Sequence, residues 1–267
     1  MVIQYVSDLH LELSSNRLWL AQHPIRPAGE ILIIAGDTAY LDDEETDAYS
    51  KYAFWDNVSK QFKQVIVCFG NHEFYGGYDV GKIPDGYERK IRDNVTGYYN
   101  GVVHLDDIDV IVSTLWAKIA PPSAFVTERG VQDFRKIRRN GKRLTADTFN
   151  EEHERCLAFV KNAVAESTAK TKIVVTHHVP THLCTADEFR GSTIDGAFTA
   201  ELGEYIAESD IKLWIYGHSH RNIDAAIGGT HLRSNQLGYV DYGEHLRHGF
   251  DLRKSVDTEL ILTPEKK

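Results

Sequence analysis

The chain has 267 residues, with 30 basic and 39 acidic side chains and a formal net charge of −9. This acidic balance excludes bulk electrostatic attraction to nucleic acid or to an anionic membrane, so we expect neither as a stable partner. Hydrophobic residues make up 42% and charged residues 26%, which excludes a disordered or fibrous chain. The sequence contains no repeat and no linker rich in Gly, Pro or Ser, and it therefore predicts a single domain over residues 1–267.

The cysteines and the N-terminus predict a cytoplasmic protein. Cys68, Cys156 and Cys184 are widely spaced and form no CxxC pair, so we expect three free thiols in a reducing compartment. The first residues lack the basic and apolar regions of a signal peptide, and no apolar run approaches 18 residues.

Short apolar runs without polar alternation recur along the chain, and polar residues follow each run directly. Such runs predict strands that are buried on both faces. We expect these strands at residues 2–6, 31–35, 65–69, 110–112, 173–175 and 213–216. Helical periodicity predicts helices over residues 43–62, 145–170 and 199–209, the second capped by Thr145 or Asp147.

The alternation of strands and helices indicates an α/β fold with a largely parallel sheet. Residues 74–101 and 117–144 fit neither pattern, so we expect long irregular segments there. Loops of this length in a compact domain are often functional. The basic cluster within residues 135–143 is either a solvated face or the source of an arginine that binds a substrate phosphate. Four aromatic residues in or beside these segments are expected in the core or stacked on a substrate: Tyr75, Tyr78, Trp116 and Phe134.

Side chains that bind metals are concentrated where the predicted strands end. They are Asp8 and His10, Asp37, Asn71 and His72, His177 and His178, and His218 and His220. Ligands bind at the carboxyl ends of strands in α/β sheets, and the i, i+2 spacing places two side chains on one side of an extended segment. A single histidine of this kind is usually structural. Two carboxylates and up to six histidines meeting without a cation would be costly, and the donors suit Mn, Fe, Zn, Co or Ni.

The ordered motifs Asp8-Leu9-His10, Gly36-Asp37, Gly70-Asn71-His72-Glu73, His177-His178-Val179-Pro180 and Gly217-His218-Ser219-His220 resemble the calcineurin-like metallophosphoesterase superfamily, as in its small bacterial-type members. The resemblance implies a four-layer α/β/β/α sandwich with two mixed β-sheets and a metal site at the strand C-terminal ends. It also implies two divalent metal ions. By position, Asp8, His10, Asp37 and His220 would hold one ion, and Asp37, Asn71, His177 and His218 the other. Asp37 would bridge the two ions, and His178 would lie behind the ligands or face the substrate.

The resemblance also assigns the chemistry. Two ions that share a site can clamp phosphoryl oxygens and acidify a water, so a bridging hydroxide would attack phosphorus in line. His72 would be the catalytic acid that protonates the leaving oxygen. Where the family usually has Gly-Asp-x-x-Asp, this chain has Gly36-Asp37-Thr38-Ala39-Tyr40, so the carboxylate that orients this histidine is missing. Tyr40, Asp42 and Glu73 are the candidates to replace it.

These features predict a metal-dependent hydrolase of phosphomonoesters or phosphodiesters, acting on a small phosphorylated substrate. A nuclease or nucleotide phosphodiesterase is an alternative, although the acidic balance disfavours a tight nucleic-acid complex. A non-catalytic binding scaffold with the same fold is a further alternative, which degenerate ligands would mark. None of the seven expected ligands is degenerate.

Overall fold

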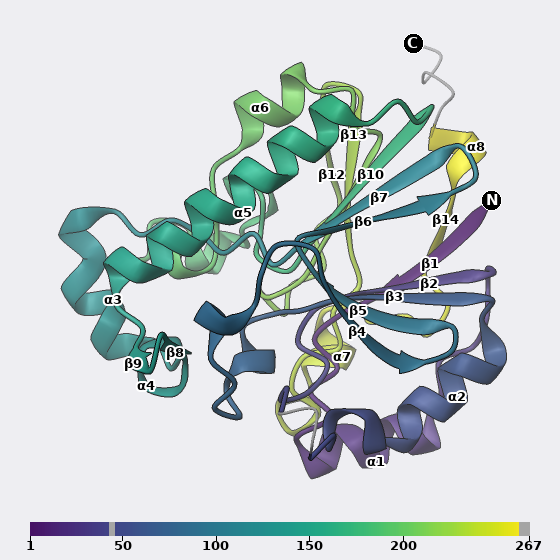
Figure 1. Cartoon of the computed structure of the whole chain (residues 1–267), viewed down its shortest axis with the longest axis horizontal. Coiled ribbons are helices and arrows are strands. Elements are labelled where there is room, and N and C mark those ends of the chain that lie inside the picture. Colours follow the sequence, from purple (N-terminus) through teal and green to yellow (C-terminus); the bar gives the residue numbers. More distant parts are fainter. Residues whose placement is uncertain (43–45, 262–267) are drawn as a thin grey trace.

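The computed structural model describes residues 1–42 and 46–261. Two mixed β-sheets lie face to face in it, and helices cover the outer face of each sheet (Figure 1). The α/β/β/α sandwich expected from the sequence is therefore confirmed. No helix in the described part of the chain combines the length and the apolar character that crossing a bilayer requires.

The first sheet has four parallel strands at its centre and one antiparallel strand at each edge. In spatial order its strands are β14 (Ser255–Asp257), β1 (Val2–Val6), β2 (Ile31–Ala35), β3 (Gln64–Cys68), β5 (Val95–Tyr99) and β4 (Tyr87–Arg92). The parallel strands place the carboxyl ends of β1, β2 and β3 at the same edge of the sheet.

The second sheet follows the same plan. Its strands are β12 (Ala225–Ile227), β13 (Thr230–Ser234), β11 (Leu213–Tyr216), β10 (Thr171–Thr176), β7 (Ile108–Ser113) and β6 (Gly101–Leu105). A separate hairpin pairs β8 (Arg138–Arg139) with β9 (Lys142–Arg143). All six strands predicted from apolar runs are present, as β1, β2, β3, β7, β10 and β11.

The apolar runs lack polar alternation because both faces of the central strands are buried. Ile33 of β2 packs between the sheets with Ile66, Val112 and Val175. Its neighbour Ile34 points the other way, into the cluster that the helices cover. Successive strand residues therefore face two different apolar layers.

Four helices form the outer layers. Helices α1 (Ser14–Gln22) and α2 (Ala53–Gln61) cover the first sheet, and α5 (Ala146–Glu166) and α6 (Gly203–Glu208) cover the second (Figure 1). Short helices are α3 (Ala124–Gly130), α4 (Asp133–Lys136), α7 (Glu244–Arg247) and α8 (Thr258–Ile261). Thr145 caps α5 as predicted, because its hydroxyl accepts from the Thr148 N–H and the Thr148 hydroxyl accepts from the Thr145 N–H.

The helix predicted over residues 43–62 is much shorter than expected. Residues 43–45 lie outside the described part, and α2 begins only at Ala53. The Asp42 carboxylate accepts hydrogen bonds from the Ala48 and Tyr49 N–H groups, which holds this stretch in a loop before a short 3₁₀ turn. The helix predicted over 199–209 is also reduced, to Gly203–Glu208.

The two segments expected to be irregular contain regular structure. Residues 74–101 include the hairpin of β4 and β5, in which Gly97 leaves room for the ring of Phe69: a Cβ there would lie 2.6 Å from that ring. Residues 117–144 contain α3, α4 and the β8–β9 hairpin. Both segments gain their structure from packing against the sandwich, and their own sequences carry no clear periodicity.

Candidate metal centre

The predicted ligands come together at one place between the two sheets. Asp8, Asp37 and Asn71 follow β1, β2 and β3 of the first sheet. His177 and His218 follow β10 and β11 of the second. The two sheets therefore face each other with the ends of five parallel strands around a common centre.

The backbone at this centre is not extended, which corrects our explanation of the i, i+2 spacing. The φ angle is positive at Asp8 (56°), His10 (47°), Asp37 (52°), His218 (76°) and His220 (51°). Left-handed conformations are uncommon outside glycine, although Asp and His tolerate them better than most residues. The chain turns sharply after each strand, and these turns direct the side chains inward. Backbone strain gathered at one site is typical of functional sites.

Two glycines make room for this convergence. Gly36 has a φ of 90°, and a Cβ there would lie 2.3 Å from Nδ1 of His177. At Gly70 a Cβ would lie 2.2 Å from Oδ1 of Asp37. The glycine of each motif is therefore needed for close packing of a neighbouring candidate ligand.

One group of donors contains Asp8, His10 and His220. Nε2 of His10 lies 3.0 Å from Nε2 of His220, and the latter lies 3.4 Å from Oδ1 of Asp8. The three donor atoms are all within 4.8 Å of one another. The Asp8 carboxylate also accepts hydrogen bonds from the His218 N–H and the Ser7 hydroxyl.

A second group contains Asp37, His177 and His218, whose donor atoms are also all within 4.8 Å. Nε2 of His177 lies 3.2 Å from Oδ1 of Asp37 and 3.1 Å from Nδ1 of His218. The amide oxygen of Asn71 lies 2.9 Å from the same Nε2, and the Asn71 amide N–H donates to Asp133 at 2.9 Å. This bond turns the carbonyl oxygen toward the group.

Asp37 lies between the two groups. Its Oδ1 faces His177, whereas its Oδ2 lies 4.0 Å from Nε2 of His10 in the first group. Oδ1 also accepts a hydrogen bond from the His72 N–H at 2.8 Å, which fixes the carboxylate plane. One carboxylate therefore presents an oxygen to each group.

The four imidazoles are oriented as metal ligands would be. Each has its outer nitrogen against an oxygen, so the other nitrogen faces the centre. The acceptors are Oε1 of Glu12 (3.1 Å from His10), the Ala35 carbonyl (2.9 Å from His177), Oε2 of Glu244 (2.7 Å from His220) and the Ala197 carbonyl (3.2 Å from His218). If every outer nitrogen carries its proton, the inner nitrogens face one another with lone pairs only, and a cation between them removes the repulsion. The residues thus fit divalent cations.

Without cations, protonated imidazoles balance the carboxylates of the centre. Burial opposes ionisation of Asp37, yet the neighbouring His177 holds the pKa of this carboxyl well below its usual range. Burial likewise opposes charge on the imidazoles, but Asp37 raises the pKa of His177 to about 9, and Asp8 with Glu244 raises that of His220 to about 10. Bound cations would displace these protons, because a ligating imidazole must be neutral.

Comparison with known proteins identifies the family. The model of the calcineurin-like phosphoesterase family matches residues 1–222. The chain belongs to this family. Its members are phosphoester hydrolases that use divalent metals, and the Asp and His groups described above could hold such ions.

Two further similarities extend over nearly the whole chain. A protein of Acanthamoeba polyphaga mimivirus, uncharacterized protein L509, is 27% identical over an alignment 290 residues long, gaps included. The alignment covers 98% of this chain and 98% of the viral protein. The crystal structure of a phosphopantetheinyl hydrolase from Mycobacterium tuberculosis aligns with a TM-score of 0.69 at 16% identity, covering 98% of both chains. At this identity the second similarity concerns the fold alone.

In this phosphoesterase the partner of His72 is a residue that sequence reasoning missed. Nδ1 of His72 lies 2.9 Å from Oε1 of Glu12, and the Glu12 side chain is only 6% exposed. The three candidates named from the sequence do not take this place. The ring of Tyr40 is 6.3 Å from that of His72, centroid to centroid, and Asp42 binds N–H groups of its own loop.

Glu73, the third candidate, links the segments that follow β2 and β3 through hydrogen bonds. Its carboxylate accepts hydrogen bonds from the N–H groups of Gly70 (2.7 Å), Thr38 (2.8 Å) and Asp37 (3.0 Å). Burial and the neighbouring Asp37 raise the pKa of Glu73 to about 8. Glu73 therefore positions the backbone of Asp37 and does not orient His72.

A cavity of about 300 Å³ opens onto the centre. Tyr75 lines it and stacks on His72 with 4.1 Å between ring centroids, so this aromatic residue of the irregular segments does reach the site. Trp116 and Phe134 lie in the core, and Tyr78 packs against it. Among the lysines and arginines of the described residues, the one that lines the cavity is Arg221, which is not a member of the basic cluster.

Sequence reasoning also missed Glu244, Asp133 and Tyr239, which surround the centre. Each lies in a segment without a strand-end motif, so its position depends on the tertiary fold. Glu12 did carry a signal, because it continues the i, i+2 series of Asp8 and His10. His178 is fully buried and packs on the ring of Trp116, which excludes a position facing the substrate.

Proposed function

We propose that this phosphoesterase holds two divalent cations and hydrolyses phosphate esters of small molecules. Asp8, His10, Asp37 and His220 would hold one cation. The other would be held by Asp37, Asn71, His177 and His218. The observation that carries this proposal is the position of Asp37, whose two oxygens face two separate groups of donors.

The cations, when bound, supply charge neutralisation for the phosphoryl group and acidify water toward neutral pH. The chain's own residues position the reactants. Nε2 of His72 lies 3.9 Å from Oδ2 of Asp37, at the wall of the cavity, while its Nδ1 is held by Glu12. An imidazolium held in this way can donate its Nε2 proton to the departing oxygen, so His72 is our candidate for the general acid.

The stacking of Tyr75 supports this assignment, because it limits rotation of the His72 ring. The Tyr75 hydroxyl in turn donates to Oδ1 of Asp133 at 2.5 Å, and the same oxygen accepts the Asn71 amide. The candidate acid and a candidate ligand are thus held by one connected network. Such preorganisation allows a proton donor to act without costly rearrangement.

A substrate panel tests the proposed function. Protein reconstituted with Mn or Zn should hydrolyse small monoesters or diesters, and the Asp37→Asn variant should not. Preference for nucleotides or nucleic acid would favour the alternative of a nucleotide phosphodiesterase or nuclease. Absence of turnover on every ester class, with metals bound, would support the scaffold instead.

A further inference from the structure

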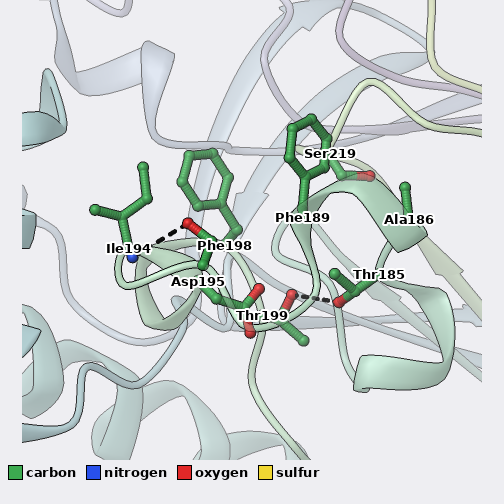
Figure 2. A pocket seen from close by; sticks show the side chains of 9 residues that line it. Thr185, Ala186, Phe189, Ile194, Asp195, Phe198, Thr199 and Ser219 are labelled. Atoms are coloured by element: carbon green, nitrogen blue, oxygen red, sulfur yellow. Dashed lines mark hydrogen bonds between the residues drawn. The ribbon is translucent and has the colours of Figure 1, made fainter.

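A second, smaller pocket shares lining residues with the cavity of the metal centre, and Figure 2 shows its side chains. We call it the apolar slot, and its volume is about 140 Å³. The segment between His178 and α6 forms most of it. The rings of Phe189 and Phe198 lie on one side, and Thr199 and Asp195 lie on the other, as Figure 2 shows. Ala186 and Ile194 supply further carbon surface.

The polar groups of the slot are already paired. The hydroxyls of Thr185 and Thr199 are 2.9 Å apart, within hydrogen-bond distance. The Asp195 carboxylate lies 3.1 Å from Nδ1 of His182, and the Ser192 hydroxyl accepts from the Ile194 N–H at 3.4 Å. An occupant therefore meets mostly carbon, and a polar occupant would lose hydrogen bonds to water without replacement.

The slot adjoins the cavity of the proposed catalytic centre. Phe189, Ile194, Phe198 and Ser219 line both the slot and the cavity of the centre. The ring of Phe198 lies 4.9 Å from the ring of His218, centroid to centroid. The Phe198 ring thus borders the slot and lies against a candidate metal ligand, which places the slot next to the centre where the phosphate would bind.

The size and charge of the slot limit what it can hold. A cavity of roughly 150 Å³ lined by apolar side chains accepts a molecule of the size of benzene. The charged side chain in the lining of the slot is the Asp195 carboxylate. The guanidinium of Arg221, 5.0 Å from the centre of the Phe189 ring, is paired with Glu188 at 2.7 Å. A second phosphate or another anionic group is therefore disfavoured.

We propose that the slot binds a compact, uncharged apolar group of the substrate, such as a short alkyl chain or a single ring, attached to the phosphate at the metal centre. This inference rests on the proposed function for the place of the phosphate. It specifies the substrates as esters with an apolar group close to phosphorus, in contrast to dinucleotide polyphosphates or other substrates with several charged groups.

Binding of alkylphosphonates tests the slot without requiring turnover. Methyl- to pentylphosphonate would be titrated into the Mn-loaded protein by calorimetry. We expect Kd to fall about fourfold for each added methylene until the slot is filled, from the transfer of apolar surface out of water. Ala186→Leu, which fills the slot, should abolish this gain, and Phe189→Ala should reduce it. Leu183→Ala is the control, since Leu183 is 55% exposed in the same segment and does not line the slot.

A constant Kd across the series in the unaltered protein would overturn the slot, even if the protein hydrolyses esters. The proposal would also be overturned if Kd still fell by the full amount with each added methylene in both Ala186→Leu and Phe189→Ala. A chain-length gain that disappears in these variants would support the slot even if no ester is turned over, and that result would count against the proposed hydrolysis alone.

Discussion

Oε1 of Glu12 accepts a hydrogen bond from Nδ1 of His72 at 2.9 Å. The same oxygen lies 3.1 Å from Nδ1 of His10. One buried carboxylate therefore holds both a candidate metal ligand and the candidate acid, in a chain that has Tyr40 where the family usually has a carboxylate. Burial alone would raise the pKa of Glu12, but the two imidazoles lower it, so the carboxylate form is favoured.

The first prediction concerns this shared carboxylate. Glu12→Gln keeps the size of the side chain but removes the charge that stabilises protonated His72. We expect kcat/KM for alkyl phosphate esters to fall about 10- to 100-fold at saturating metal. Loss of a carboxylate that hydrogen-bonds a metal-ligating histidine typically lowers activity by this factor. Esters of p-nitrophenol should lose less, because their leaving group needs no proton.

The control for Glu12 is Glu244→Gln. Glu244 holds Nδ1 of His220 at 2.7 Å and has no such contact with His72. This variant should weaken metal binding but leave the ratio of alkyl to p-nitrophenyl rates unchanged once metal is saturating. If both variants change the ratio equally, Glu12 acts only through the metals.

The second prediction concerns His72 itself. His72→Ala should keep its metals, since no proposed ligand is removed. Its kcat/KM on alkyl esters should fall about 100- to 10,000-fold, the usual contribution of general acid catalysis, and less on p-nitrophenyl esters. Metal content is checked in each preparation. Equal losses on both ester classes would assign His72 to phosphate binding and remove it from the acid role.

The third prediction concerns the close packing at Gly70. A methyl group there would collide with Oδ1 of Asp37, so Gly70→Ala should displace the carboxylate and lower kcat/KM about 100-fold, as misplacements near 1 Å can do. Gly229→Ala is the matched control, because its Cβ would meet no atom closer than 3.9 Å. Wild-type activity in Gly70→Ala would show that the position of Asp37 is not critical.

The fourth prediction concerns the bridging position of Asp37. Asp37→Asn should lose both cations or nearly all turnover, because one carboxylate is expected to contribute charge to both. The control is Asp109→Asn, the same substitution at the N-terminal end of β7, away from the strand ends that form the centre. This variant should retain metals and turnover. Metal analysis of the two purified variants provides the comparison. Normal turnover in Asp37→Asn would contradict a two-cation site.

The sequence predicted the central strands well, because β2 and β10 are buried on both faces and need unbroken apolar runs. It failed for β4 and β5, whose structure depends on pairing with β3 and on the space that Gly97 leaves. Helix α1 was also missed, because its weakly amphipathic sequence shows no clear apolar face. Local patterns cannot reveal elements that tertiary contacts stabilise.

In the candidate site, too, local motifs predicted some features, and others depend on tertiary contacts. The residues after each strand could be named from motifs, and the structure brings all of them together. The reason for their convergence could not be predicted, because the left-handed backbone at Asp8 and His10 replaces the extended geometry assumed. Asp133 and Glu244 orient Asn71 and His220 from distant segments. Such partners follow from the three-dimensional fold and carry no signal in spacing.

The central claim is that two divalent cations at this centre support ester hydrolysis. The most direct measurement is the rate of p-nitrophenyl ester hydrolysis while metal-free protein is titrated with Mn. We predict negligible rate without metal, a rise on addition, and a plateau when two equivalents per chain are bound. Full activity in the metal-free protein, or a plateau at one equivalent with the second never binding, would contradict the account.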